Sequence, residues 1–151
     1  MSTQWIVFVI VLISNAIIAF VIAVLLGRKH AAPGRNAMRW MLVSLAIWAF
    51  GYAMITLSPS LEAKIFWLRI ENVGILTVPV FWFIFTVQYA QVDRWLNKYT
   101  GALFFVIPFV SLVLIFSDRW FHFYYSAVRP VSESGGPLVI ERGPWYLVST
   151  I

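Results

Sequence analysis

The stretch 67–89, WLRIENVGILTVPVFWFIFTVQY, constrains this chain more than any other part of it. It is long and apolar enough to cross a lipid bilayer, yet it contains Arg69, Glu71 and Asn72 and is interrupted by Pro79. Charged side chains within a membrane span are costly unless they are paired or face a protein interior. We therefore expect a helix packed inside a membrane-embedded bundle, and not a soluble enzyme.

The composition independently indicates a membrane protein. Hydrophobic residues make up 62% of the chain and charged residues 11%, with a mean hydropathy of +0.86. A soluble domain carries about a quarter charged residues, so this chain has too little polar surface to cover a globule in water. Cysteine is absent, which excludes a disulfide framework and cysteine-based metal or catalytic sites.

The apolar segments predict a single membrane domain over 1–151: an all-α integral membrane helical bundle of four full spans and the start of a fifth. Ser58 or Ser60 is expected to cap the third helix, with Glu62 in its first turn. The spans are expected at 5–26, 40–57, 61–90, 101–116 and, incompletely, 145–151.

Residues 118–144, between the fourth and fifth spans, differ in character. FHFYYSAV and PLVIE are typical of two short strands flanking the turn-forming ESGG. We expect a short extracellular β-hairpin laid on the membrane surface. Its aromatic run 120–125 either lines a mouth for an apolar ligand or, as is more common, forms an interfacial belt. Since the chain stops after less than half of a fifth crossing, we expect it to be the front of a larger protein.

Positive charge gathers on one side of the predicted spans. The basic loop 27–39 and the loop after the third span together carry a net charge of +5, and the remaining charges sum to zero. By the positive-inside rule these loops face the cytoplasm, so the N-terminus and the segment 118–144 face outward. No nucleic-acid partner is needed to explain the pI of about 9.9, because the charges flank apolar spans and form no basic face.

Three segments of the chain resemble the sequence pattern of a known family, the N-terminal seven-transmembrane sensor region of bacterial and archaeal histidine kinases and diguanylate cyclases. The similar segments are AIWAFGYAM, SLEAKIFWLRIENVGILTVPVFWFIFTVQYA and RGPWYLVST, in the second, third and fifth spans. In the third span, the tryptophan, polar, glycine, proline and tyrosine positions of the family pattern fall on Trp67, Glu71, Gly74, Pro79, Trp82 and Tyr89.

The resemblance implies a sensory input module in a bacterial or archaeal inner membrane. It would detect an extracellular or membrane-borne stimulus, such as a small or apolar ligand, and relay it to a cytoplasmic kinase or cyclase in the same polypeptide, with the full-length protein acting as a homodimer. The chain itself is not expected to be an enzyme, because it contains no phospho-acceptor histidine motif and no nucleotide-binding glycine motif. No cofactor or metal is expected, since neither His30 nor His122 lies within a span.

The candidate ligand-binding residues are Trp67, Arg69, Glu71 and Asn72. Trp67 and Glu71 share one helical face, while Arg69 and Asn72 lie on a neighbouring face. In a functional interpretation they form the polar floor of an outward-facing pocket, where Glu71 receives a cation or a donor and Asn72 hydrogen-bonds a ligand. In a structural interpretation Glu71 pairs with Arg69, Lys64 or a polar group elsewhere, because an ionisable group inside a membrane must be satisfied whatever its function.

Gly74 and Pro79 are predicted to shape the third helix. Gly74 allows a close helix approach, and Pro79 removes one backbone hydrogen bond and favours a kink, which is either the moving part of a sensor or a static packing feature. Two other function classes stay open: a small transport or channel subunit in which Arg69, Glu71 and Asn72 line a permeation route, and a structural scaffold completed by partner helices. The lack of repeated halves argues against a transporter.

Overall fold

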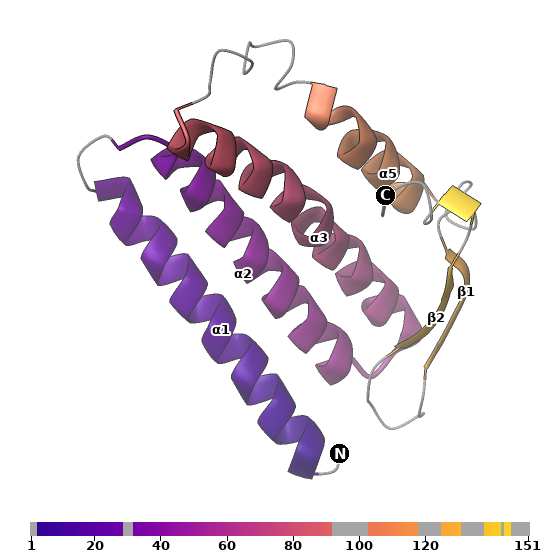
Figure 1. Ribbon diagram of the computed structural model, residues 1–151. Helices are drawn as coiled ribbons and strands as arrows, with labels where there is room; N and C mark the ends of the chain where they lie inside the picture. The colour runs from indigo at the N-terminus through magenta and orange to yellow at the C-terminus, as the bar shows by residue number, and fades with distance from the viewer. Residues whose placement is uncertain are drawn as a thin grey trace.

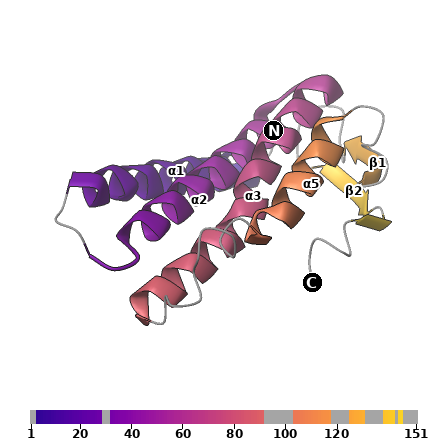
Figure 2. The same cartoon turned by 90° about the horizontal axis from the view of Figure 1, so that it is seen from above.

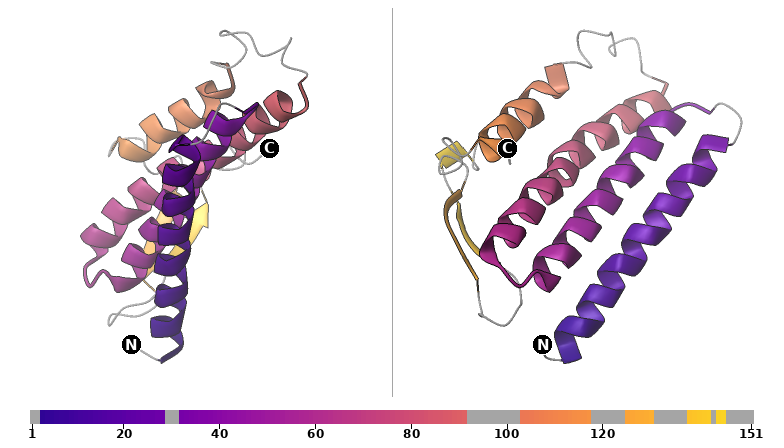
Figure 3. Two further views of the ribbon diagram at one scale, coloured as in Figure 1. Left: turned by 90° about the vertical axis from the view of Figure 1, so that its left-hand side faces the viewer. Right: turned by 180° about the vertical axis from the view of Figure 1, so that it is seen from behind.

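The computed structural model describes residues 3–28, 32–91, 103–117, 125–130, 138–142 and 144–145. Its elements are α1 (Thr3–Arg28), α2 (Arg35–Leu57), α3 (Leu61–Tyr89), α5 (Val106–Phe116), β1 (Tyr125–Pro130) and β2 (Leu138–Arg142). The four helices lie side by side in the order α1, α2, α3, α5, each antiparallel to its neighbour (Figure 1; Figure 3 shows the same order from behind). The two strands lie beyond the C-terminal end of α5 and beside the N-terminal part of α3 (Figure 1 and Figure 2).

The helices α1, α2 and α3 are each long and apolar enough to cross a membrane. In α1, the buried residues Val9, Ala16 and Ala23 recur every seven positions and form one stripe, while large apolar side chains on the other faces are exposed. Such exposure suits a lipid environment, in which a helix satisfies its backbone internally and needs no polar surface. The predicted class, a multi-pass helical membrane protein, is confirmed.

The first three predicted spans correspond to long apolar helices in the structure, with one change at the start of α2. The helix begins at Arg35 and not at residue 40, so the connection to α1 is shorter than the predicted loop 27–39. The break between the two helices falls at Pro33 and Gly34. Gly34 has a φ of 76°, a left-handed conformation that glycine adopts without a steric penalty.

The fourth span is only partly matched by the structure. The helix α5 has 11 residues, about half of what a crossing requires. It restarts at Val106 after a turn at Phe105 that follows two helical residues, and Pro108 occupies its first turn, where the missing N–H is tolerated. Four full spans therefore remain a prediction, as does the fifth, of which only residues 144–145 are described.

Two strands are present where strands were expected. They pair in antiparallel fashion, with Pro130 opposite Leu138 and Arg129 opposite Val139, and the register is irregular between Tyr125 and Ala127. Residues 118–124 and 131–137 lie outside the described part of the chain. The extracellular hairpin and its interfacial belt thus remain predictions.

Several polar side chains within the long helices form hydrogen bonds to backbone groups of their own helix. The hydroxyls of Ser14, Thr56 and Thr86 each donate to the backbone carbonyl four residues earlier, at distances of 2.8 to 3.0 Å. The predicted cap of α3 is confirmed, because the Ser60 hydroxyl accepts from the Ala63 N–H at 3.3 Å, with Glu62 in the first turn. These helices therefore enter an apolar environment with few unmet hydrogen bonds.

The helices α2 and α3 approach each other closely at two glycines, one from each helix. A Cβ atom on Gly74 would lie 2.5 Å from the Ser44 carbonyl oxygen and 2.7 Å from the Trp48 backbone nitrogen. A Cβ atom on Gly51 would lie 2.9 Å from the Glu71 Cβ atom. Close backbone contact between small residues is a usual way for membrane helices to associate. Gly74 thus lies where α2 and α3 are in close backbone contact.

The core lies where α2, α3, α5 and β1 meet. Its buried apolar members are Ile55, Leu68, Leu76, Ile115 and Tyr125. Two side-chain hydrogen bonds bridge elements around it: the Thr77 hydroxyl donates to the Ser44 Oγ at 2.9 Å, and the Trp145 indole donates to the Ser111 Oγ at 3.0 Å. Long-range contacts thus tie the C-terminal part of the chain to the helical layer.

Replacing Gly74 with alanine tests the importance of this crossing. Because the added methyl group would meet backbone atoms that cannot move independently, we expect Gly74→Ala to lower the free energy of unfolding by about 1–3 kcal/mol, measured by denaturant titration in detergent micelles. The matched control is Gly27→Ala, whose Cβ would meet only the flexible Arg39 guanidinium and which should be neutral or stabilising by up to about 1 kcal/mol. Equal changes in the free energy of unfolding for the two variants would contradict a close backbone contact at Gly74.

Candidate ligand-binding site

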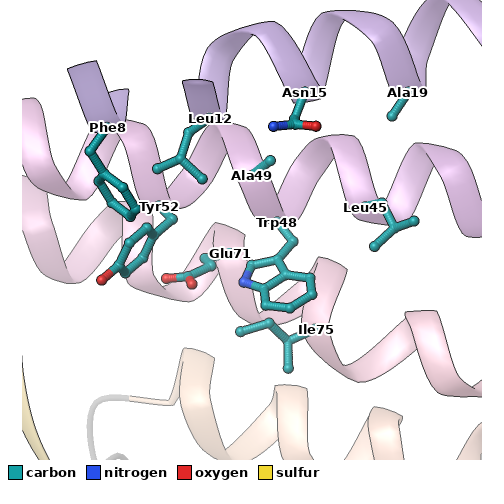
Figure 4. A pocket seen from close by; sticks show the side chains of 10 residues that line it. All are labelled: Phe8, Leu12, Asn15, Ala19, Leu45, Trp48, Ala49, Tyr52, Glu71 and Ile75. Carbon is teal, nitrogen blue, oxygen red and sulfur yellow. The ribbon is translucent and has the colours of Figure 1, made fainter. Parts of the chain in front are cut away.

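A pocket of about 630 Å³ opens between α1, α2 and α3. Figure 4 shows the side chains that line it, with Glu71 and Ile75 at the α3 wall. This volume falls within the range of ordinary small-molecule sites, about 300–1,000 Å³. Among the described residues, the lining consists of Phe8, Leu12, Asn15 and Ala19 from α1, Leu45, Trp48, Ala49 and Tyr52 from α2, and Glu71 and Ile75 from α3.

Glu71 is held at the base of this pocket by the α2–α3 crossing. Its backbone lies against Gly51, and its side chain is 5% exposed. The Trp48 indole N–H donates a hydrogen bond to the Glu71 carboxylate, and in Figure 4 the two side chains point toward each other. The Trp48 backbone in turn touches Gly74. The same close approach therefore places both the acid and its donor.

The other polar groups of the pocket come from α1 and α2. Tyr52 lies beside Glu71, and its ring meets the Phe8 ring edge to face, with centroids 5.7 Å apart. Asn15 uses its amide nitrogen to donate to the Val11 carbonyl at 2.9 Å, which leaves its side-chain oxygen as the group that can accept a bond from a ligand. The arrangement combines aromatic rings, hydrogen-bond acceptors and one carboxylic acid within apolar walls.

Asn72 lies on a different side of α3 from Glu71. It is 1% exposed, donates to the Leu68 carbonyl at 2.7 Å and accepts a hydrogen bond from the Tyr125 hydroxyl at 2.9 Å. Tyr125 belongs to β1 and is itself buried. This one member of the aromatic run 120–125 is thus anchored in the core and not in an interfacial belt. The bond joins β1 directly to α3.

Of the four predicted ligand-binding residues, the structure brings Glu71 alone to the pocket. Trp67 packs against the core and makes an edge-to-face contact with Phe50, with centroids 5.7 Å apart. Arg69 is partly buried and is not among the residues that line the pocket. The helix α3 runs without interruption through Pro79, which is exposed.

The chain was compared with known proteins. A family model described as the N-terminal 7TM region of histidine kinase matches residues 7–151. The chain belongs to this family. Searches of curated proteins and of solved structures gave no match.

Membership places this 7TM region among the membrane-embedded sensory input regions of histidine kinases, in agreement with the resemblance seen in the sequence. Such a region is a sensor and is not itself catalytic. Its association with histidine kinases implies a cytoplasmic signalling domain.

Sequence reasoning about the 7TM region missed most of the pocket. Trp48 and Tyr52 lie in the AIWAFGYAM segment, where aromatic residues alone do not indicate a hydrogen bond to an acid on another helix. Asn15 interrupts an otherwise apolar helix, and a polar residue inside a membrane span is a usable signal for a functional position. Tyr125 carried no signal beyond its place in an aromatic run.

Removing the indole N–H of Trp48 tests its bond to Glu71. In Trp48→Phe the buried carboxyl group loses its donor, so we expect the free energy of unfolding of the 7TM region to fall by about 1–3 kcal/mol. The control is Trp82→Phe on the exposed surface of α3, where a change within about 0.5 kcal/mol is expected. Denaturant titration followed by circular dichroism measures both, and an equal loss in the two variants would refute the role given to Trp48.

Proposed function

We propose that this 7TM region detects an extracellular or membrane-borne stimulus by binding a small or apolar ligand in the pocket between α1, α2 and α3, and relays it to a cytoplasmic output domain in the same polypeptide. The observation that carries the proposal is a buried carboxyl group, Glu71, at the base of a ligand-sized pocket inside a histidine kinase input region. The proposal includes a bacterial or archaeal inner membrane, an outward N-terminus, four full spans followed by a fifth, a short extracellular hairpin and a homodimeric full-length protein.

The helix α3 is the element best suited to carry the signal. Its N-terminal half contacts the pocket through Glu71 and the outer strands through the Asn72–Tyr125 bond. Its C-terminal half contacts α2 and α5 through Phe81, which stacks on Trp40 with centroids 6.4 Å apart and meets Phe105 edge to face at 5.5 Å. A displacement of α3 near the pocket would thus reach the neighbouring helices at the opposite end. Pro79 lies between these two halves and removes one backbone hydrogen bond.

The two other function classes make different demands. A transport or channel subunit would need polar groups along a continuous route, and Glu71 and Asn72 instead face different neighbours. Solute or ion flux through liposomes containing the chain would favour that class. A purely structural scaffold has no need of a pocket that ends at a carboxyl group, and it would show no stimulus-dependent change in α3.

Substitutions in α3 test the signalling role. We expect Glu71→Gln and Asn72→Ala to change the autophosphorylation rate of the full-length kinase in membrane vesicles by about fivefold or more, because the first removes the acidic group at the base of the pocket and the second removes the hydrogen bond between α3 and Tyr125. Both variants should still accumulate in the membrane. The matched control is Glu62→Gln at the exposed start of α3, which should leave the rate unchanged. If both test substitutions only abolish accumulation, the two residues are structural and the proposal fails.

Single cysteines test the proposed orientation, since the native chain has none. Glu62→Cys and Asn36→Cys place an exposed thiol at opposite ends of the helical layer. We expect a membrane-impermeant maleimide to label Glu62→Cys in intact cells, and to label Asn36→Cys only after permeabilisation. The reason is that the C-terminal end of α1 and the N-terminal end of α2, which carry basic residues, stay in the cytoplasm. The reverse pattern would contradict an outward N-terminus.

A further inference from the structure

We infer that the pocket between α1, α2 and α3 binds a lipophilic organic cation, an alkylated amine or quaternary ammonium compound whose charge pairs with Glu71. This inference rests on the proposed function and deepens it by naming the chemical class of the ligand. It is argued from the charge, the aromatic content and the shape of the pocket.

The charge of the lining favours a cation. Glu71 is the one ionisable acid among the ten lining residues, and none of the ten is Lys, Arg or His. A carboxylate has about four lone-pair sites, and the donor that the structure gives it is the single N–H of Trp48. The side-chain oxygen of Asn15 adds a further acceptor. A buried carboxylate is stable in an apolar site when a positive charge accompanies it, and this lining supplies none.

The aromatic residues around Glu71 point to the same class. Trp48 and Tyr52 of α2 flank the carboxyl group, and Phe8 of α1 packs against the Tyr52 ring (Figure 4). The face of an aromatic ring is negative and attracts cations, and rings combined with an acid are a common way to bind substituted ammonium groups. Anions would be repelled by both the rings and the acid.

The size and the walls of the pocket exclude a bare metal ion as its occupant. Among the described residues there is no group of three or more His, Cys, Asp or Glu side chains that could hold a metal. Hard cations require about six oxygen ligands, and a single carboxyl group cannot supply them. A volume of about 630 Å³ also exceeds what an ion fills. The remaining lining is aliphatic and fits a hydrocarbon chain: Leu12, Ala19, Leu45, Ala49 and Ile75.

Three probes with the same ten-carbon chain isolate the contribution of charge: decyltrimethylammonium, decyl sulfate and 1-decanol. Each probe is titrated at submicellar concentration into nanodiscs of zwitterionic lipid that contain the protein. Binding to empty nanodiscs is subtracted. We expect the wild-type chain to bind the ammonium probe about tenfold more tightly than decanol, and to bind decyl sulfate most weakly, because Glu71 attracts the first and repels the third.

Substitutions test whether the preference for the ammonium probe depends on the residues of the pocket. Glu71→Gln should remove the preference for the ammonium probe, and Glu62→Gln, an exposed glutamate on the same helix, should keep it. Tyr52→Leu leaves Glu71 and its Trp48 bond in place, and it should weaken ammonium binding about three- to tenfold through the loss of one ring. This second variant keeps the inference falsifiable if Glu71→Gln fails to fold.

The possible results separate the ligand class from the signalling role. Equal binding of the three probes overturns the inference, and a changed kinase output in Glu71→Gln would then still uphold the sensor function. Selective ammonium binding supports the inference even if the probe leaves kinase output unchanged, in which case the proposed function fails instead. If the wild-type chain binds none of the probes, the inference is overturned and the pocket is assigned to packing against another membrane segment.

Discussion

The backbone contact between α2 and α3 is the interaction on which the rest of the structure depends. It consists of two reciprocal pairs, Gly51 with Glu71 and Trp48 with Gly74, and in each helix the two members are three residues apart. Since a methyl group at either glycine would collide with the partner helix, the helices meet at one register. That register sets where the Glu71 carboxyl group lies and brings the Trp48 indole within reach of it. A single geometric constraint therefore positions both the packing interface and the chemistry of the pocket.

Much of the fold could be predicted because it depends on local properties of the sequence. The lengths of the first three apolar segments determine α1, α2 and α3, and Ser60 ends the turn before α3 by accepting a backbone hydrogen bond. Close packing at Gly74 could be predicted for the same reason, since only glycine leaves room for a neighbouring backbone. The short helix α5 was harder to predict, because a continuous apolar run does not reveal the turn at Phe105.

The candidate site could be predicted only in part, because its geometry depends on contacts between helices. Glu71 and Asn72 are adjacent in the sequence but point about 100° apart around a helix. One meets Trp48 and the pocket, and the other meets Tyr125. A sequence shows that both are polar groups in an apolar segment, and does not show which neighbours they meet. The pocket also needs α1, whose contribution through Phe8 and Asn15 follows from packing and from no motif.

The hydrogen bonds of α3 differ in when they can form during synthesis. Chains emerge from the ribosome N-terminus first, so Trp48 has already been made when Glu71 enters the membrane. The donor to Asn72 is Tyr125, 53 residues later in the chain. Until that residue arrives, Asn72 retains only its bond to the Leu68 carbonyl. The side of α3 that faces the pocket can thus be completed by the first three helices alone, whereas the side that carries Asn72 is completed only when β1 has been translated and has folded back.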